Sequence, residues 1–497
     1  MAGEIQYKWI ALSITSLGAL LGVLNSSTLI IALPTIMVKL HTDLISMMWV
    51  LMGYTLVLTI LAPAWGRLAD IYGRRNLYIF GLAVFTFGSL LCGLSETVGQ
   101  LIAFRVVQAF GGSLILANST VIVVDAFGRG ELGRAMGVNS MVIAATFAFG
   151  PILGGFLTLI DWRWNFFFNV PIGILVTIWA YLQLREVVVL PSGQKLDILG
   201  MIAFTIALLS LLSVLTIGFL FDISPLFLVL LIALTLGSFG AFIYIESRAE
   251  HPLIDLHLFK IRIFSYGQLS AFLNSIARGA VMLLLILFFQ GPRGYDPLMA
   301  SILILPMAIA IAITGPIGGV LSDKYGSRVI ATLGLGISLI GLMGLSLMKY
   351  DTEYSVIATW MFIMGFGSGL FQPPNTSAIM ASVPIERRGI ASAARALLMN
   401  TGMVISMGLA FPLILSTIPM QELLDMFVVG GKAMPVEVQA AFTKGLTTAF
   451  IGSSIITVPA IIVSALRGKE DRRDGIADRE DTRALREAAI SGLCAQA

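Results

Sequence analysis

The sequence is poor in charge and in cysteine. Only 12% of its 497 residues are charged, about half the ~25% that is usual in soluble domains, while 57% are hydrophobic. Its two cysteines, Cys92 and Cys494, and three histidines suggest neither a disulfide framework nor a metal site. It also lacks a Gly-Lys-Ser/Thr phosphate loop and a recognisable nucleophile–base–acid set. We therefore expect no enzyme activity, no cofactor, no metal and no nucleic-acid partner.

Long apolar runs, by contrast, recur along nearly the whole chain. Most reach roughly 18 residues or more, which is enough to cross a hydrocarbon core of ~30 Å as a helix. The pattern predicts an all-α integral membrane protein with fourteen spans. The expected spans are 9–31, 47–66, 77–95, 100–124, 136–159, 166–185, 198–218, 225–245, 264–290, 298–320, 329–348, 355–379, 389–416 and 444–466.

The positions of the lysines and arginines predict the orientation. An even number of spans puts both termini on one side, and most of the 31 basic residues lie on that side. By the positive-inside rule, both termini are cytoplasmic in a multi-pass protein of the plasma membrane. Residues 417–443 then form the longest outward connection, in which we expect a short amphipathic element, and residues 467–497 form a charged cytoplasmic tail.

A repeat divides the chain into two related parts. Seven residues recur at a constant offset of 253: Pro63, Gly66, Leu68, Asp70, Tyr72, Gly73 and Arg75 return as Pro316, Gly319, Leu321, Asp323, Tyr325, Gly326 and Arg328. We interpret the chain as a six-helix bundle (1–185), two inserted helices with a linker (186–263), a second six-helix bundle (264–466) and the tail (467–497). Parallel repeats of this kind place a solute site near the midplane between the halves.

The repeated loop has a specific physical interpretation. Its glycines permit a tight turn, its acid can accept hydrogen bonds at a helix N-terminus, and its arginines can pair with acids at neighbouring helix ends. We interpret it as a conformational latch, with Asp125 as the nearest acid for Arg74 and Arg75; the alternative is a tight turn that only signals topology. The predicted latch residues are Gly66, Asp70, Gly73, Arg74, Arg75, Asp125, Asp323, Gly326 and Arg328.

At these residues the chain resembles the major facilitator superfamily. Gly66-Arg-Leu-Ala-Asp-Ile-Tyr-Gly-Arg-Arg75 is similar to the signature loop of that family, and Arg105-Val-Val-Gln-Ala-Phe-Gly-Gly112 to its fourth-helix motif. Gly150-Pro-Ile-Leu-Gly-Gly155 resembles the fifth-helix motif of exporters. Ala32-Leu-Pro34 and Trp162-Arg-Trp-Asn-Phe-Phe-Phe-Asn-Val-Pro-Ile-Gly173 resemble the fourteen-helix drug:proton antiporter subfamily.

The resemblance implies a secondary active transporter that exports amphipathic molecules in exchange for protons. One position departs from the subfamily pattern, because Asn25 stands where an aspartate is usual in the first helix. Asparagine does not titrate, so a proton site would have to use an acid at a helix end, such as Asp43, Glu96 or Asp125. The implied partners are the lipid bilayer, a small-molecule substrate and protons, and we expect a monomeric chain.

Charged and polar residues inside the spans are candidates for a substrate site. All 28 acids fall outside the span centres, whereas Arg105, Arg278 and Arg395 lie within spans, where a charge costs roughly 2.5–3.5 kcal/mol even on the lenient insertion scale. Arg105 and Asn25 lie at similar depth, so we expect a shared hydrogen bond; Arg395 is interpreted as a brace or gate. The predicted substrate-binding residues are Asn25, Tyr54, Arg105, Asn118, Asn274, Arg278 and Asn400.

Small residues in the fifth span predict close helix packing. Gly150, Pro151, Gly154 and Gly155 combine a kink with short side chains, and a packing role is at least as well supported as a directional one. Two functions remain open. The first is proton-coupled export of an amphipathic organic compound, and the alternative is potential-driven or weakly proton-coupled transport of an anionic or neutral metabolite, which the buried arginines favour.

Overall fold

The structure is a bundle of α-helices. The computed structural model describes residues 2–127, 142, 146, 149–186, 197–220, 224–249, 252, 256–383, 388–429 and 434–468, and within these ranges it contains helices and no strand. The earlier helices are α1 (Ala2–Lys39), α2 (Leu44–Tyr72), α3 (Arg74–Gly93), α4 (Val98–Ala126), α6 (Trp164–Phe167), α7 (Asn169–Gln183), α8 (Ile198–Leu220) and α9 (Pro225–Arg248). The later helices are α10 (Arg262–Arg278), α11 (Val281–Gln290), α12 (Pro297–Leu303), α13 (Leu305–Tyr325), α14 (Ser327–Ser346), α15 (Tyr354–Ala381), α16 (Arg388–Leu415), α17 (Met420–Val429) and α18 (Val436–Leu466), with a 3₁₀ turn at Leu256–Lys260. The all-α prediction is confirmed.

Twelve segments of the described chain are helical, long and apolar enough to cross a membrane. Two shorter apolar helices, Ile45–Leu61 and Phe149–Ile160, coincide with the second and fifth predicted spans. The count of fourteen spans therefore stays a prediction. The amphipathic element expected in the connection 417–443 is confirmed as α17, whose Leu423 and Met426 are fully buried.

The 253-residue offset extends beyond the residues that first revealed it. Asp43 and Asp296 both cap a helix, accepting a hydrogen bond from the backbone N–H of Ser46 at 2.8 Å and of Met299 at 2.9 Å. Helices α2, α3 and α4 pack on one another as α13, α14 and α15 do in the second half. Because the caps, turns and helix contacts coincide, the two halves share one local architecture.

Glycines bring the paired helices of each half into backbone contact. A Cβ built on Gly88 of α3 would lie 2.6 Å from the Cα of Gln108 of α4. A Cβ on Gly341, at the same 253-residue offset, would lie 2.6 Å from the Cα of Met364 of α15. Small residues permit such close approach in membrane helices, where tight packing replaces the hydrophobic driving force.

The inserted helices lie against both halves. Helix α8 contacts α2 of the first half and α16 of the second, and it also packs along α9. Phe204, Leu208 and Leu212 of α8 belong to the same apolar cluster as residues from the two halves. Helix α9 exposes Leu226, Leu230 and other large apolar side chains, as expected for a helix that faces lipid.

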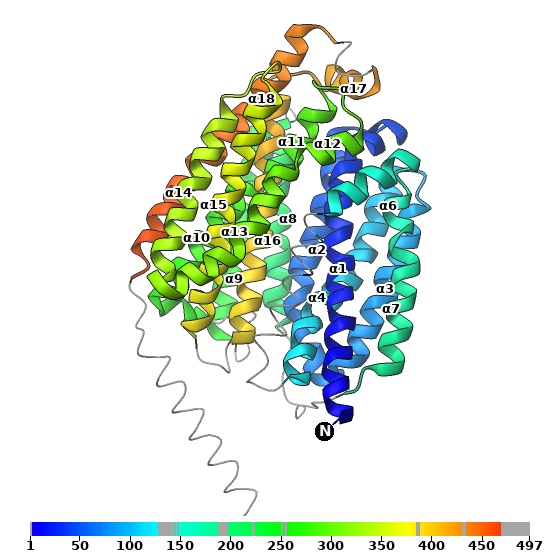
Figure 1. Cartoon of the computed structure of the whole chain (residues 1–497), viewed down its shortest axis with the longest axis vertical. Coiled ribbons are helices and arrows are strands. Elements are labelled where there is room, and N and C mark those ends of the chain that lie inside the picture. The colour runs from blue at the N-terminus through cyan, green and yellow to red at the C-terminus, as the bar shows by residue number, and fades with distance from the viewer. Residues whose placement is uncertain are drawn as a thin grey trace, which may run out of the picture.

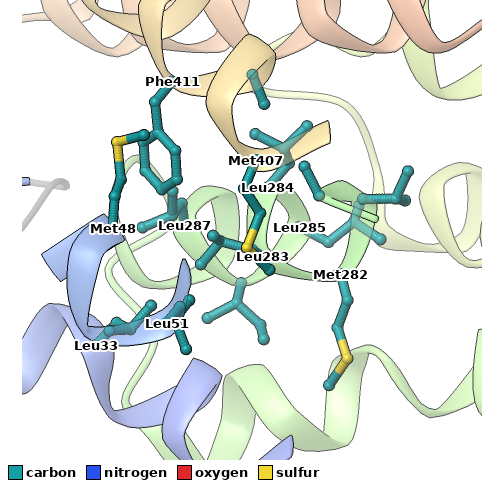
Figure 2. Close-up of a cluster of buried hydrophobic side chains, with 14 of the residues drawn as sticks. Leu33, Met48, Leu51, Met282, Leu283, Leu284, Leu285, Leu287, Met407 and Phe411 are labelled. Atoms are coloured by element: carbon teal, nitrogen blue, oxygen red, sulfur yellow. The ribbon is translucent and has the colours of Figure 1, made fainter. Parts of the chain in front are cut away.

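The halves meet in an apolar cluster at one end of the bundle. Figure 1 shows α1 running from the marked N-terminus to the end where α11, α12 and α17 lie, which we call the Lys39 end. There, Leu33, Met48 and Leu51 of the first half lie near Leu283, Leu287, Met407 and Phe411 of the second (Figure 2). These residues and their buried neighbours on α1, α2, α11 and α16 form what we call the inter-half cluster. All ten residues of α11 are buried.

Candidate functional site

A buried polar cluster lies inside the first half, around Arg105 of α4. Arg105 is 1% exposed, and its Nη1 donates to Oε1 of Gln108 at 2.6 Å while its Nε donates to the carbonyl oxygen of Val50 at 3.3 Å. The guanidinium carbon lies 4.0 Å from the centre of the Tyr54 ring, in the geometry of a cation–π contact. Among the described residues no carboxylate bonds to Arg105, so neutral groups hold this charge.

Gln108 joins Arg105 to the first helix. Its Nε2 donates to Oδ1 of Asn25 at 3.0 Å and to Oγ of Ser89 at 2.7 Å. The expected direct hydrogen bond between Arg105 and Asn25 is wrong, because the Gln108 amide lies between them and serves both. The sequence analysis missed Gln108 and Ser89. The signal for Gln108 was available, since residues three apart share a helix face and Gln108 follows Arg105 by three.

The other predicted polar residues are dispersed. Asn118 of α4 donates to the carbonyl oxygen of Leu114 at 2.8 Å, within its own helix. Asn400 of α16 is half-buried. Arg395, also on α16, donates from Nη2 to Oε1 of Gln372 at 3.0 Å and so ties α16 to α15, as the bracing interpretation predicts.

Asn274 and Arg278 lie together where the helix of the ninth span is interrupted. Helix α10 ends at Arg278, a turn follows at Gly279 and Ala280, and α11 begins at Val281. Asn274 is 2% exposed and lies one turn before Arg278. No carboxylate of the described chain pairs with Arg278.

The signature turn of the first half is held by an acid that the sequence analysis did not consider. The Glu186 carboxylate, just after α7, accepts from the backbone N–H groups of Arg74 and Arg75, both at 3.0 Å. The Arg75 guanidinium donates to the carbonyl oxygens of Leu184 at 2.6 Å and Tyr181 at 2.7 Å. Arg75 therefore binds the C-terminal end of α7, and Glu186 caps the N-terminus of α3.

The corresponding turn of the second half has the same backbone. Gly73 has φ 94° and ψ 131°, and Gly326 has φ 88° and ψ 143°, a region that residues with a Cβ rarely adopt. Arg328 follows Gly326 in α14. The side chains of Asp70, Asp125 and Asp323 and the surroundings of Gly66 lie outside the part of the chain that the structure describes, so the latch stays a prediction.

The glycines of the fifth span contact two different neighbours. Gly150 lies against the Ser27 hydroxyl, and a Cβ on Gly154 would lie 2.6 Å from the Cα of Thr28, so both glycines face α1. A Cβ on Gly155 would lie 2.8 Å from the Cα of Leu298 in α12, across the boundary between the halves. Pro151, between them, is buried.

Polar and apolar contacts join the halves at the Lys39 end. Gln290, the last residue of α11, donates from Nε2 to the carbonyl oxygen of Ile31 at 2.9 Å. Pro34 lies one turn further along α1, where its missing N–H interrupts the helix ladder. A small apolar void there is lined from both halves, by Leu33, Pro34, Met37, Met47, Leu283 and Leu287.

Solved structures show which fold this arrangement belongs to. The chain aligns with a bacterial homolog of the human lysosomal transporter Spinster in an inward-facing, unoccupied conformation, with a TM-score of 0.63, 17% identity and coverage of 93% of this chain and 97% of that one. It also aligns with the nucleoside transporter NupG (D323A mutant), with a TM-score of 0.63, 11% identity and coverage of 93% and 100%. At these identities the likeness establishes the fold.

Sequence relatives establish the family. The Major Facilitator Superfamily matches over residues 15–407, and the chain belongs to this family of membrane transporters. It is 32% identical to the riboflavin transporter RibZ of Clostridioides difficile, over 82% of this chain and 88% of RibZ. It is 31% identical to multidrug resistance protein 3 of Bacillus subtilis, over 78% of this chain and 77% of that protein.

Proposed function

We propose that this transporter exports small amphipathic organic molecules across the plasma membrane by alternating access. The observation that carries the proposal is the inter-half cluster, in which residues from both halves close the Lys39 end. With both termini cytoplasmic, as the basic residues predict, the Lys39 end faces outward. The described arrangement is then the state closed to the outside, and export requires the halves to separate there.

The relatives support transport of amphipathic solutes. They include a riboflavin transporter and multidrug resistance and multidrug transporter proteins from several bacteria. Riboflavin and typical drugs combine an aromatic body with polar groups. The interior of this chain offers both kinds of surface, since the buried polar side chain of Asn25 lies on α1, which also carries apolar residues of the inter-half cluster.

Proton coupling, which the family resemblance implies, has a competing alternative. Asn25 cannot titrate, and Asp43, one of the acids at helix ends, already caps α2. The alternative is a potential-driven or weakly proton-coupled transporter of an anionic or neutral metabolite. The membrane potential alone favours exit of an anion by ~2.3 kcal/mol per charge per 100 mV.

A reversible cross-link tests alternating access. Leu33→Cys and Leu287→Cys place thiols from opposite halves around one void, in a background where Cys92 and Cys494 are replaced by alanine. We expect a reducible bifunctional thiol reagent to stop accumulation of multidrug-panel dyes in inverted vesicles, and reduction to restore it. The control pair Leu33→Cys and Met47→Cys lines the same void from the first half alone and should leave accumulation intact after cross-linking. Equal accumulation by both cross-linked proteins would contradict the proposal.

A further inference from the structure

The interruption between α10 and α11 is held in place by α16. The Ser406 hydroxyl of α16 accepts from the backbone N–H of Ala280 at 2.9 Å. One turn earlier, the Ser275 hydroxyl donates to the carbonyl oxygen of Met399 at 2.5 Å. A Cβ on Gly279 would lie 2.9 Å from the Cα of Met403, so the two backbones touch. The helix break is therefore a fixed feature of the second half.

Two polar side chains on a neighbouring face of α10 have no partner. Asn274 and Arg278 are four residues apart and share that face, each one position before the residues Ser275 and Gly279 that contact α16. In the described chain, neither side chain makes a hydrogen bond. Arg105 and Arg395, the other two arginines within spans, bond to Gln108 and Gln372. Side-chain hydrogen bonds therefore account for those two arginines, whereas Arg278, in the last turn of α10 where the helix dipole favours a cation, makes none among the described residues.

The surroundings of Arg278 favour a negative group. Its guanidinium offers five N–H donors and no acceptor, and the Asn274 amide offers two more donors. Arg278 lies in the last turn of α10, at the negative end of that helix dipole, and α11 starts three residues later with its positive end, which attracts anions. A charge in mid-membrane without a counter-ion is costly, so a site of this kind gains most from an anionic ligand.

Arg278 occupies the position in the second half that corresponds to Asn25 in the first. Arg278 follows Asn25 by 253 residues, the offset that relates the helix caps Asp43 and Asp296. Asn25 belongs to the buried polar cluster of the first half. Parallel repeats place the substrate site near the membrane midplane, between the halves. Ala280 to Leu284, which follow shortly after, are apolar and buried in the inter-half cluster.

We propose that Arg278, with Asn274 one turn away, binds the carboxylate or other oxyanion of an amphipathic substrate, so that the transported molecules are organic anions. This inference rests on the proposed function and names its substrate class. The donors of Arg278 and Asn274 hold the charged end, and the first turn of α11 contacts the apolar body. An organic anion would also neutralise Arg278, the one arginine within a span that has no hydrogen-bond partner among the described residues.

Two related dyes test the charge preference. Fluorescein carries a free carboxylate, whereas rhodamine 6G has a similar xanthene body, an esterified carboxyl group and a positive charge. Binding is measured by fluorescence anisotropy with the full chain in nanodiscs, with empty nanodiscs subtracted. We expect wild-type protein to bind fluorescein more tightly than rhodamine 6G. Arg278→Gln should weaken fluorescein binding by at least about tenfold, equivalent to about 1.4 kcal/mol, and leave rhodamine 6G binding unchanged or tighter.

Two further variants separate binding from bracing. Arg278→Lys keeps the charge and should retain most of the fluorescein affinity. Arg395→Gln removes a partnered arginine of α16 and should affect both dyes alike. The thermal unfolding midpoint of each variant is measured first, to confirm folding. Equal loss of both dyes in Arg278→Gln, unchanged fluorescein binding, or a wild-type preference for rhodamine 6G would overturn the inference.

Transport in inverted vesicles separates this inference from the proposed function. Vesicles that accumulate rhodamine 6G but not fluorescein would overturn the anion site and leave an exporter. Fluorescein binding that depends on Arg278, without accumulation of either dye, would keep the site and contradict export. Accumulation of fluorescein that is lost in Arg278→Gln would support both.

Discussion

Gly73 and Gly326, 253 residues apart, turn the chain with nearly the same backbone angles, yet of the two only Gly73 lies against a carboxylate of the described residues. A Cβ on Gly73 would lie 2.8 Å from Oε2 of Glu186, whereas a Cβ on Gly326 would have no atom within 4 Å. The two turns are thus a matched pair. Both glycines have positive φ. Gly73 in addition lies beside the Glu186 carboxylate, which caps the N-terminus of α3.

Alanine at the two glycines should therefore have unequal effects. Gly326→Ala should lower stability by about 1–3 kcal/mol, because its φ is unfavourable for a residue with a Cβ. Gly73→Ala should cost about 0.5–2 kcal/mol more, because the new methyl group displaces the Glu186 carboxylate from the backbone N–H groups that it caps. Thermal unfolding of the purified protein measures both. In a Glu186→Ala background the extra cost should disappear, and equal costs in the wild-type background would refute the capping role.

Gln108 should contribute strongly to stability, because it links Arg105 to Asn25. Gln108→Leu leaves Nη1 of Arg105 and the Asn25 amide oxygen without the partners described above, and an unsatisfied buried group costs about 1–3 kcal/mol, more when it is charged. Gln108→Glu restores an acceptor for Arg105 and should recover much of the loss. The unfolding midpoint in detergent reports both changes. Asn118→Leu, which removes a bond within one helix, is the control, and a Gln108→Leu loss no larger than that control would contradict the network.

Asn25→Asp should introduce pH dependence into transport. The new carboxyl group replaces an amide whose oxygen lies 3.0 Å from Nε2 of Gln108, one hydrogen bond away from Arg105. Because asparagine does not titrate, the wild-type rate should vary less with pH than the rate of the variant. Proton movement on substrate addition is followed with a pH-sensitive dye inside proteoliposomes. Asn118→Asp places a carboxyl group elsewhere on α4 as the control. Identical pH profiles for wild type and Asn25→Asp would show that position 25 has no part in coupling.

Gly155→Ala should loosen the Lys39 end. The added methyl group meets the α12 backbone at Leu298, which cannot rotate away, and overpacking of this kind typically costs about 1–3 kcal/mol. A penalty of 1.4 kcal/mol on the closed state changes the closed-to-open ratio about tenfold. We expect faster labelling of a Leu33→Cys reporter by an impermeant maleimide, with the two native cysteines replaced by alanine.

Gly22→Ala is the matched control for that labelling experiment. A Cβ at Gly22 of α1 would have no atom within 4 Å, so this variant should label as slowly as the parent. In Gly154→Ala the new methyl group meets Thr28 of α1, within the same half, so this variant should destabilise the protein without the same increase in labelling. If Gly155→Ala labels no faster than Gly22→Ala, the contact with Leu298 does not hold the halves together.

The candidate site was only partly predictable. The apolar runs predicted the spans and singled out Arg105, Asn25, Asn274 and Arg278, because a charged or polar residue within an apolar run is visible in the sequence itself. The predicted partner of Arg105 was Asn25, because the two residues lie at similar depth in the membrane. The side chain that bonds to Arg105 is that of Gln108, one turn along the same helix. Glu186 was missed because its link to Arg74 and Arg75 spans more than 110 residues, and no local pattern marks it.

Local chemistry in the chain determined the class of this protein. Apolar runs long enough to cross a bilayer require helices, because an unpaired backbone N–H or carbonyl group is too costly in lipid. The repeated loop at a 253-residue offset indicates two related halves. The tertiary structure alone decided which polar groups find partners. Gln108 accepts a hydrogen bond from Arg105, Gln372 accepts one from Arg395, and Gly155 faces the opposite half while Gly154 faces its own. These outcomes depend on the relative rotation and depth of packed helices, which distant contacts determine and one-dimensional spacing does not.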